Sequence, residues 1–358
     1  MRQAGLFGLS DHLKRISAHG DPLEVLGRVV DFEAFRATLD AALDYSDGAK
    51  GGRPPYDPVT MLKVLVLAAQ NNVSDARMEY LIRDRLSWLR FLGFDLGAPT
   101  PDANTIRLFR ERLTQAGALD ALFAAFDRQL KDRGYLPMGG QIVDATLVAA
   151  PKQRNTLAEK DAIKAGGKAS EVWPNQPAKA AQKDTDARWT LKFAKAKPLA
   201  NGKPGIDIAI PAFGYKSSVS ICRTFGFIRK GKVTDAARFD GKMLRDVVTK
   251  DNTASDVWAD TAYRSQANEK WLKQQGRVSR IHRRKPRGRP MPERTARANA
   301  AKSKVRARVE HVFAHQKDKM GLFVRTIGIK RAEAKIVLAN LAYNMHRLIF
   351  HERRGAMA

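Results

Sequence analysis

Residues 141–148, QIVDATLV, form a short apolar run with a single carboxylate, Asp144, in its middle. The β-branched residues around Asp144 and the turn-forming pair Gly139-Gly140 before the run predict a β-strand rather than part of a helix. An ionised carboxylate inside a mostly buried strand is costly unless a cation meets it. For this run taken alone, a strand-end Asp bonded to a neighbouring loop is the commoner explanation. Two further acids downstream favour a functional explanation.

The charge of the chain predicts a polyanionic partner. Its 358 residues include 64 Lys and Arg against 37 Asp and Glu, a formal net charge of +27. Solubility does not require such an excess, so nucleic acid is the first candidate partner and an acidic membrane surface the second. The longest apolar run, residues 64–69, is too short to span a bilayer, and the first residues lack the core of a signal peptide. We therefore expect a cytoplasmic, nucleoid-associated protein with no membrane partner. The single cysteine, Cys222, excludes an internal disulfide framework and a cysteine-rich zinc site.

Apolar residues at helical spacing predict that residues 1–134 form an all-helical N-terminal domain. A polar, Gly- and Pro-rich stretch at residues 46–55 is predicted to be a linker. Residues 59–69 are apolar on nearly every side, which indicates a buried helix. Ser74 is predicted to cap the next helix, on which Tyr80 would face the core.

A further helix of this domain carries candidate DNA contacts. Thr100 is predicted to cap it, with Pro101 at its first position. Arg107 and Arg110 on this helix could form the reading face of a helix-turn-helix-like module, in which a second helix lies in the major groove. An arginine stripe is more often only a solvated helix face, and both explanations stay open at this point.

Residues 135–358 predict a second domain with a strands-first mixed sheet. The predicted elements are a hairpin of strands 213–221 and 225–233, a helix at 240–248, a short strand within 255–262 that ends in Asp260, a helix at 265–275, a brief strand at 277–281 and a long packed helix at 332–350. Residues 151–205 are rich in Lys, Ala, Gly and Pro and predict a long loop or partly ordered insertion. Within it, the polar and aromatic motif 183–189, KDTDARW, could be a substrate loop but is not specific.

A strongly basic block covers residues 277–308, with thirteen Lys or Arg against the single acid Glu293. Such a block repels itself unless phosphates neutralise it, although a solvated basic loop would have the same composition. Arg283, Arg284 and Lys285 at its centre are the candidate DNA contacts.

A predicted helix at 303–319 carries the third acid, Glu310. At 100° per residue, Arg306 and Lys317 lie on the same face as Glu310 and are candidate contacts to DNA phosphates. The structural alternative is an exposed Arg306–Glu310 pair of a few tenths of a kcal/mol. His311 and His315 are also four residues apart, but their order relative to Glu310 does not match the His-Glu-x-x-His pattern, which disfavours zinc there.

Asp144, Asp260 and Glu310 are the candidate catalytic and metal-binding residues. Carboxylate oxygens are the ligands that hard Mg²⁺ ions prefer, with substrate phosphate and water completing the coordination. Two such ions about 3.5–4 Å apart can activate an attacking hydroxyl and stabilise the leaving oxygen of a phosphoryl transfer. The chemistry and the charge of the chain thus predict the same partner.

At this point the chain resembles the DDE-type transposases of bacterial insertion sequences, in the large family numbered five. The motifs that carry the resemblance run through nearly the whole chain: 55–58 PYDP, 101–106 PDANTI, 143–146 VDAT, 183–189 KDTDARW, 213–216 FGYK, 233–235 VTD, 259–263 ADTAY, and Arg306-x₃-Glu310-x₆-Lys317. Each is weak alone, but their order is specific. The related signature places a Tyr three residues before the Arg, where this chain has Ser303.

The resemblance implies an α+β protein with a helical N-terminal domain and a ribonuclease-H-like catalytic domain, with Asp144, Asp260 and Glu310 as its acids. It further implies two Mg²⁺ ions, with Mn²⁺ as a substitute, and double-stranded DNA partners: the inverted-repeat ends of the element and the target DNA. A homodimer on DNA is compatible with this implication. The alternatives are a non-catalytic DNA-binding regulator derived from a transposase, and a ribonuclease-H-like repair or recombination nuclease, which would share the metal site but not the helical domain.

Overall fold

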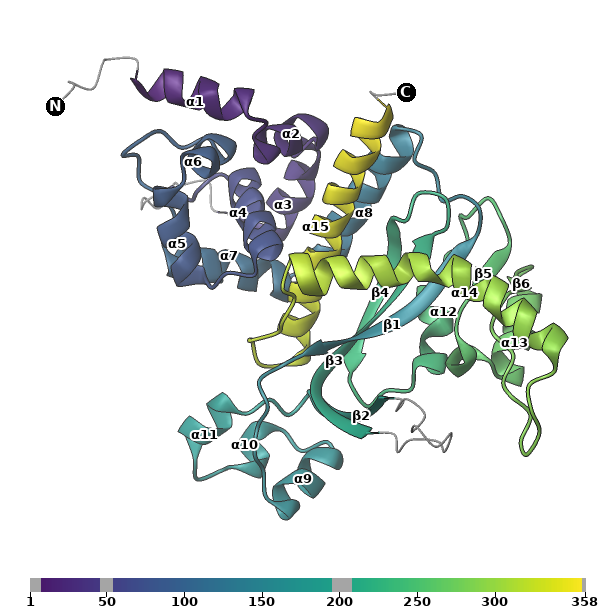
Figure 1. Ribbon diagram of the computed structural model, residues 1–358. Helices are drawn as coiled ribbons and strands as arrows, with labels where there is room; N and C mark the ends of the chain where they lie inside the picture. The colour runs from purple at the N-terminus through teal and green to yellow at the C-terminus, as the bar shows by residue number, and fades with distance from the viewer. Residues whose placement is uncertain (1–7, 46–53, 195–207, 356–358) are drawn as a thin grey trace, which may run out of the picture. The chain divides into compact units, whose positions relative to one another are not determined.

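The computed structural model describes residues 8–45, 54–194 and 208–355 (Figure 1). The chain forms two compact units. The first contains residues 1–136, 314–321 and 337–358, and the second contains residues 137–313 and 322–336. The boundary after residue 136 lies within two residues of the division drawn from the sequence, whereas the two C-terminal segments join the first unit. Residues 46–53 of the predicted linker lie outside the described residues.

The described part of the first unit is helical, as the periodicity predicts. Its N-terminal elements are α1 (Gly8–Ala18), α2 (Pro22–Val29), the short turn η1 (Glu33–Phe35), α3 (Arg36–Leu43), α4 (Pro58–Asn71), α5 (Asp75–Asp84), α6 (Leu86–Leu92), α7 (Ala103–Gln115) and α8 (Ala118–Asp132). Helix α4 is buried along most of its length, because its apolar residues leave no polar face.

Two of the helices with side-chain caps, α5 and α7, test the caps predicted from the sequence. Ser74 caps α5 as predicted and accepts a hydrogen bond from the backbone of Arg77. The start of α7 differs from the prediction: Asp102 is its cap and accepts from the Thr105 amide at 2.6 Å, while Thr100 accepts from Arg83 Nε at 3.0 Å. The predicted core position of Tyr80 is wrong, because its side chain is 53% exposed and covered on one face by the Arg77 guanidinium.

The second unit is built on a mixed sheet of six strands within the described residues. These are β1 (Gln141–Ala149), β2 (Arg188–Ala194), β3 (Ile208–Cys222), β4 (Ile228–Asp235), β5 (Asp256–Trp258) and β6 (Val278–Ser279). The order is β2-β3-β1-β5-β6, and β4 also pairs with β3. The long β3 pairs with β2 along residues 208–214 and with β4 along residues 215–221, antiparallel in both cases. The predicted hairpin of β3 and β4 is therefore confirmed.

The two edges of β1 have opposite pairing. β1 is antiparallel to β3 on one side and parallel to β5 on the other, and β5 is parallel to β6. β5 ends two residues before the predicted strand end at Asp260, because Asp260 accepts a hydrogen bond from the Ala262 amide at 2.8 Å and turns the chain into η3 (Thr261–Tyr263).

Short helices cover one face of this sheet. They are η2 (Asp240–Met243), α12 (Leu244–Val247) and α13 (Gln266–Gln274). A fully buried cluster joins Val143 of β1 and Val257 of β5 to Leu244, Tyr263 and Leu272 from these helices and η3. The residues next to these in the strands, Ile142 and Trp258, are also buried, so β1 and β5 are covered on both faces at this end of the sheet.

The insertion at 151–205 is more ordered than predicted. It contains α9 (Leu157–Lys164), α10 (Ala169–Val172), α11 (Pro177–Gln182) and β2, and residues 195–207 lie outside the description. Glu159 links its helices by accepting from Trp173 Nε1 at 2.7 Å and from Lys179 Nζ at 2.6 Å. The basic composition concealed this small helical layer, because its single buried tryptophan gives no periodic signal.

Two long helices complete the chain. Helix α14 (Glu293–Ala314) begins ten residues before the predicted helix 303–319, and it runs across the face of β1 in Figure 1. It passes into a π-helical turn, η4 (His315–Lys319), and α15 (Ile329–Gly355) follows. None of the helices in the described ranges combines the length and apolarity that crossing a bilayer requires.

Candidate active site

The parallel pairing of β1 with β5 aligns the first two acids. Ile142 is paired with Trp258. Asp144 lies two residues beyond Ile142, and Asp260 lies two residues beyond Trp258. In parallel strands equal steps keep equal height along the sheet, and a step of two returns to the same face. The two carboxylates therefore leave the sheet at the same level and on the same side.

That side is the one opposite the helices α12 and α13. Val143 and Ala259, the residues just before the two acids, are fully buried in the cluster beneath the sheet. Alternation along each strand then directs Asp144 and Asp260 to the other face, where α14 lies.

Arg306 of α14 meets Asp144 directly. Its Nη2 atom is 2.7 Å from Asp144 Oδ2, and the two side chains are only 15% and 14% exposed. The other carboxylate oxygen of Asp144 accepts from the Ala145 amide at 2.8 Å. The cation that a buried strand carboxylate needs is therefore supplied from the protein itself. The predicted exposed i,i+4 pair with Glu310 is not the bond that Arg306 makes.

Glu310 lies one helical turn after Arg306 and is exposed to solvent. Burial by itself would lower the pKa of the Arg306 guanidinium, but the charges of Asp144, Asp260 and Glu310 outweigh burial and raise it. All three predicted acids thus act on one guanidinium. Their gathering about Arg306 is the main feature of the site.

Asp144 titrates abnormally in this environment. Burial raises the pKa of its carboxyl above the ordinary value, and the nearby charge of Asp260 adds to the rise, while Arg306 opposes it. Two neighbouring carboxylates, Asp144 and Asp260, create a demand for positive charge at this site. Arg306 meets only part of this demand, since one guanidinium faces three acids.

The oxygen-only donor set fits a hard divalent cation such as Mg²⁺, and the excess of negative charge fits it as well. In the arrangement described here, however, no three His, Cys, Asp or Glu side chains among residues 8–45, 54–194 and 208–355 lie close enough to share a metal ion. The guanidinium of Arg306 takes up an Asp144 oxygen that a metal ion would need. Asp144, Asp260 and Glu310 are the residues that would hold the ion.

Tyr263, which the sequence marks only as the end of the 259–263 motif, lies beneath the acids. It is fully buried, and its hydroxyl has no hydrogen-bond partner among the described residues. Burial raises the pKa of Tyr263 well above its ordinary value, and the charges of Asp144, Asp240 and Asp260 add to this rise. Its hydroxyl is therefore a neutral donor close to the acidic site.

The centre of the basic block lies beside Asp260. Arg284 Nε donates to the carbonyl of Thr261, the residue after Asp260, at 3.2 Å. Asn299 of α14 holds the neighbouring backbone, because its side chain accepts from Arg283 N at 3.0 Å and donates to Arg283 O at 2.9 Å. Arg283, Arg284 and Lys285 are all exposed. The predicted basic loop is thus anchored at the edge of the acidic site with its charges in solvent.

Lys317 does not lie on the α-helix that carries Glu310. The chain leaves α14 at Ala314, and residues 315–319 form the π-helical turn of the first unit. A π-turn contains more residues than an α-turn, so a spacing of seven no longer returns to the same face. The helix-face argument for Lys317 is therefore wrong, and its contact with DNA stays a prediction. His315 bonds to His346 at 3.0 Å rather than pairing with His311.

The two arginines predicted on α7 have partners within the first unit. Arg110 forms two hydrogen bonds of 2.6 Å to the carboxylate of Asp75, and Arg107 donates to Asn104 at 2.7 Å. The two hydrogen bonds to Asp75 occupy both terminal nitrogens of the Arg110 guanidinium, which could otherwise bind two oxygens of a phosphate. This arrangement favours the structural explanation for Arg110, and its contact with DNA stays a prediction.

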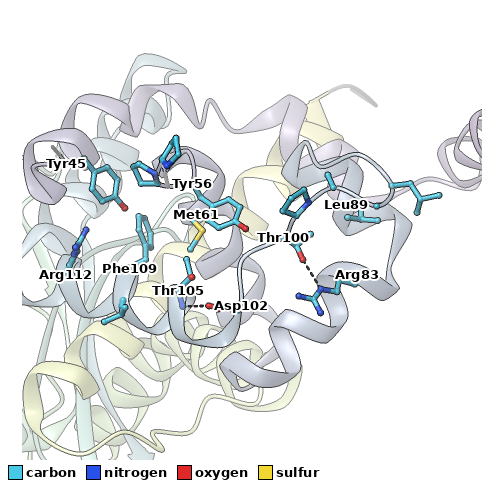
Figure 2. A pocket seen from close by; sticks show the side chains of 17 residues that line it. Tyr45, Tyr56, Met61, Arg83, Leu89, Thr100, Asp102, Thr105, Phe109 and Arg112 are labelled. Atoms are coloured by element: carbon cyan, nitrogen blue, oxygen red, sulfur yellow. Dashed lines mark hydrogen bonds between the residues drawn. The ribbon is translucent and has the colours of Figure 1, made fainter. Parts of the chain in front are cut away.

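The first unit also contains a cavity of about 770 Å³ near these residues (Figure 2). Phe109 and Arg112 of α7 line it with Tyr45, and the Arg112 guanidinium carbon is 5.5 Å from the centre of the Tyr45 ring. The bond from Arg83 to Thr100 lies on the opposite side (Figure 2). The cavity is lined by residues of the first unit, so it is separate from the acidic site.

The motif 183–189 has a structural explanation. Asp184 is buried, accepts from the Tyr215 hydroxyl at 2.6 Å and from the amides of Asp186 and Ala187. Asp186 accepts from the Ile329 amide at the start of α15. The two acids thus fasten the insertion to β3 and α15, and the substrate-loop interpretation has no contact that supports it.

The mixed sheet, with one acid on β1, a second just after β5 and a third on a helix across the same face, is the arrangement of a ribonuclease-H-like domain, and it follows a helical N-terminal domain in the sequence. The family described as Transposase DDE domain matches residues 136–345, and the chain belongs to this family. A second family, described as Transposase domain (DUF772), matches residues 10–112. The protein is thus a DDE-type transposase enzyme of an insertion sequence.

Among solved structures, the chain is similar to the piggyBac transposase in a cryo-EM structure of its synaptic complex with hairpin DNA. The TM-score is 0.43 with 10% sequence identity, over 93% of this chain and 76% of that chain.

Proposed function

We propose that the enzyme binds the terminal inverted repeats of its own element, cleaves the DNA ends and transfers the freed strands to target DNA. The observation that carries this proposal is that Asp144 and Asp260 leave the sheet on the face where α14 lies, where Arg306 of α14 binds Asp144 and Glu310 follows one helical turn later. Two Mg²⁺ ions, for which Mn²⁺ can substitute, are the expected cofactors. When bound, they supply charge stabilisation for the attacking and leaving oxygens of phosphoryl transfer.

The protein's own residues perform the other tasks. The exposed Arg283, Arg284 and Lys285 loop, anchored by Asn299, supports the proposal because it places phosphate-binding charge next to Asp260. Phosphate contacts of this kind position the duplex without reading its sequence. Recognition of the inverted repeats is assigned to the helical front domain, with Arg107 as the candidate that retains the freer guanidinium. Action as a homodimer and membership of insertion-sequence family five stay predictions.

Cleavage of a labelled duplex that carries the inverted repeat, with purified full-length protein and Mg²⁺, tests the proposal. Asp144→Asn, Asp260→Asn and Glu310→Gln should each lower the cleavage rate by on the order of 10³-fold or more, because each removes charge from the reacting centre. Binding to the same duplex should stay equal or become slightly tighter, since each variant removes a negative charge near phosphate.

The matched control is Asp246→Asn, which removes an exposed carboxylate from α12, on the helix-covered face of the sheet. Its cleavage rate should equal that of the unmodified enzyme. If one of the three acid variants still cleaves at the rate of the unmodified enzyme, the residue changed in that variant is not catalytic. Tight binding of the ends without Mg²⁺-dependent cleavage by the unmodified protein would favour the non-catalytic regulator instead.

A further inference from the structure

We infer that Arg306 is an exchangeable internal cation, which holds the acidic site closed to metal ions in the free enzyme and moves to a DNA phosphate when DNA binds. This inference rests on the proposed function, because it assigns the metal site to the same three acids. It adds a regulatory step: metal binding and DNA binding become coupled through one side chain.

The first argument is competition for a ligand atom. Arg306 Nη2 donates to Asp144 Oδ2 at 2.7 Å, and the Ala145 amide occupies Asp144 Oδ1. Both carboxylate oxygens of Asp144 therefore have donors already. A metal ion that binds Asp144 through Oδ2 comes into direct contact with the guanidinium, and the repulsion between the two cations favours displacement of Arg306.

The second argument is the balance of charge. Asp144, Asp260 and Glu310 carry three negative charges against the single positive charge of Arg306. One divalent ion would make this group neutral, and a second ion would leave it with two positive charges. The bound metal ions would then repel Arg306 from the acids. DNA phosphates would offer it negative charge elsewhere. Metal loading thus favours the movement of Arg306 toward DNA.

The third argument is an unused donor. Arg306 Nε is buried and has no hydrogen-bond partner among the residues described. A guanidinium presents Nε and one Nη as a fork that matches two oxygens of a phosphate. Asp144 engages only one nitrogen, so the bond in the free enzyme is incomplete. A phosphate could satisfy both nitrogens, which makes the exchange favourable for Arg306.

Mn²⁺ binding to the full-length protein without DNA tests the inference and does not require activity. Free Mn²⁺ is followed by electron paramagnetic resonance during titration of the unmodified protein and Arg306→Gln. Removal of the competing cation should tighten Mn²⁺ binding roughly tenfold or more, the equivalent of one hydrogen bond to a charged group. Arg306→Lys, which keeps the charge but not the fork, should lie between the two.

Two controls assign the effect to this site. Arg297→Gln removes an exposed arginine from the same helix, one that pairs with Glu293 away from the acids, and should leave Mn²⁺ affinity unchanged. Adding Asp144→Asn to Arg306→Gln should abolish the tight binding. Mn²⁺ should also raise the thermal unfolding midpoint of Arg306→Gln more than that of the unmodified protein, because the variant without metal leaves three acids uncompensated.

A second titration includes a short duplex DNA. The unmodified protein should bind Mn²⁺ roughly tenfold more tightly with DNA than without it, because DNA draws Arg306 away from Asp144. Arg306→Gln should show a smaller gain.

The outcomes separate the inference from the proposed function. Equal Mn²⁺ affinity of Arg306→Gln and the unmodified protein, with binding in both that Asp144→Asn abolishes, would overturn the exchange and leave the metal site intact. If Asp144→Asn leaves the Mn²⁺ affinity unchanged in both the unmodified and the Arg306→Gln background, the metal site and the exchange are both overturned. Weaker binding by Arg306→Gln would show that Arg306 supports the metal site and would also overturn the exchange.

Discussion

Asp144 shows how one residue both constrains the fold and requires a partner. A carboxylate in the middle of an apolar strand predicts a cation nearby, and the structure supplies Arg306 from 162 positions further along the chain. Removing one member of a buried ion pair leaves the other uncompensated, which costs about 3–5 kcal/mol when burial is complete and less in this partly exposed pair. The Asp144–Arg306 pair therefore contributes little to the stability of the fold, and its expected role is in the exchange of Arg306 for metal ions.

His315 and His346 form a second pair whose chemistry is decided by burial. Their rings are joined by a 3.0 Å hydrogen bond between Nε2 of His315 and Nδ1 of His346. Burial lowers the pKa of His315, and burial with the neighbouring His315 lowers the pKa of His346 to about 4. Because both pKa values are lowered, both rings are mainly neutral at pH 7, and one ring donates the hydrogen bond that the other accepts.

This pair predicts a pH dependence of stability. Below pH 6.5 the unfolded chain binds more protons than the folded one, so stability falls as pH falls; for His346 the loss is up to about 1.4 kcal/mol per pH unit between pH 6.5 and about 4. The thermal unfolding midpoint should therefore drop between pH 7 and pH 5. His346→Gln, which keeps a hydrogen-bonding group but does not titrate, should reduce this drop.

The control for the histidine pair is His12→Gln, at an exposed position of α1, which should leave the pH dependence unchanged. A pH dependence in His346→Gln equal to that of the unmodified protein would show that other groups cause it.

At the scale of elements, the pairing of β1 with β5 aligns Asp144 with Asp260. Gly140, just before β1, allows the backbone of β5 to approach closely. Its φ is +91°, and a Cβ atom there would lie 2.5 Å from the Trp258 ring and 2.6 Å from the Asp256 carbonyl oxygen. Asn252 bonds to both the amide and the carbonyl of Gly140. No other residue type could adopt this conformation and leave β5 in place.

Gly140→Ala should therefore lower the free energy of unfolding by on the order of 3 kcal/mol or more, since strain from positive φ and a steric clash add together. Cleavage should fall as well, because the register between Asp144 and Asp260 is disturbed. Gly134→Ala is a matched control: its φ is +81° but nothing lies within 4 Å of the added Cβ, so it should cost only about 1 kcal/mol. Urea unfolding measures both, and equal losses of stability would contradict the role of the close approach.

At the scale of the whole molecule, the charge of +27 is unevenly distributed. Thirteen Lys or Arg lie between residues 277 and 308; five of them, from Arg283 to Arg289, are in the anchored loop, and six, from Arg294 to Arg308, are on α14. Several others have internal roles, such as Arg277, which donates to backbone carbonyls including Lys250 O at 2.6 Å. Some residues of the basic block therefore hold the backbone of the second unit together, and others present positive charge to solvent.

The surface role predicts a steep salt dependence of DNA binding. Changing Arg283, Arg284 and Lys285 together to Ala should flatten the plot of log binding constant against log salt by about 0.9 for each DNA phosphate that the variant no longer neutralises. Binding to the inverted-repeat ends and to random duplex should weaken by similar factors, because phosphate contacts carry no sequence information. Affinities at several salt concentrations measure this.

Two results would contradict the role of the loop. An unchanged slope would show that it does not touch DNA. A selective loss of end binding would move sequence recognition from the helical front domain to the loop.

Local sequence signals determined much of the fold. The apolar periodicity predicted the helical front domain, the β3–β4 hairpin and strand β1, because repeats of 3.6 and of 2 residues follow directly from backbone geometry. The ordered motifs predicted Asp144, Asp260 and Glu310 as the candidate acids, since each stands in its own recognisable segment. These features depend only on neighbours in the chain.

Tertiary structure decided which groups meet. The partner of Arg306 is Asp144 rather than Glu310, because α14 crosses β1 and the buried carboxylate binds the guanidinium more strongly than an exposed one. Arg110 bonds to Asp75, the insertion folds around Trp173, and the π-turn after Ala314 removes Lys317 from the predicted helix face. None of these contacts has a local signal, because each depends on burial and on residues that are distant in sequence.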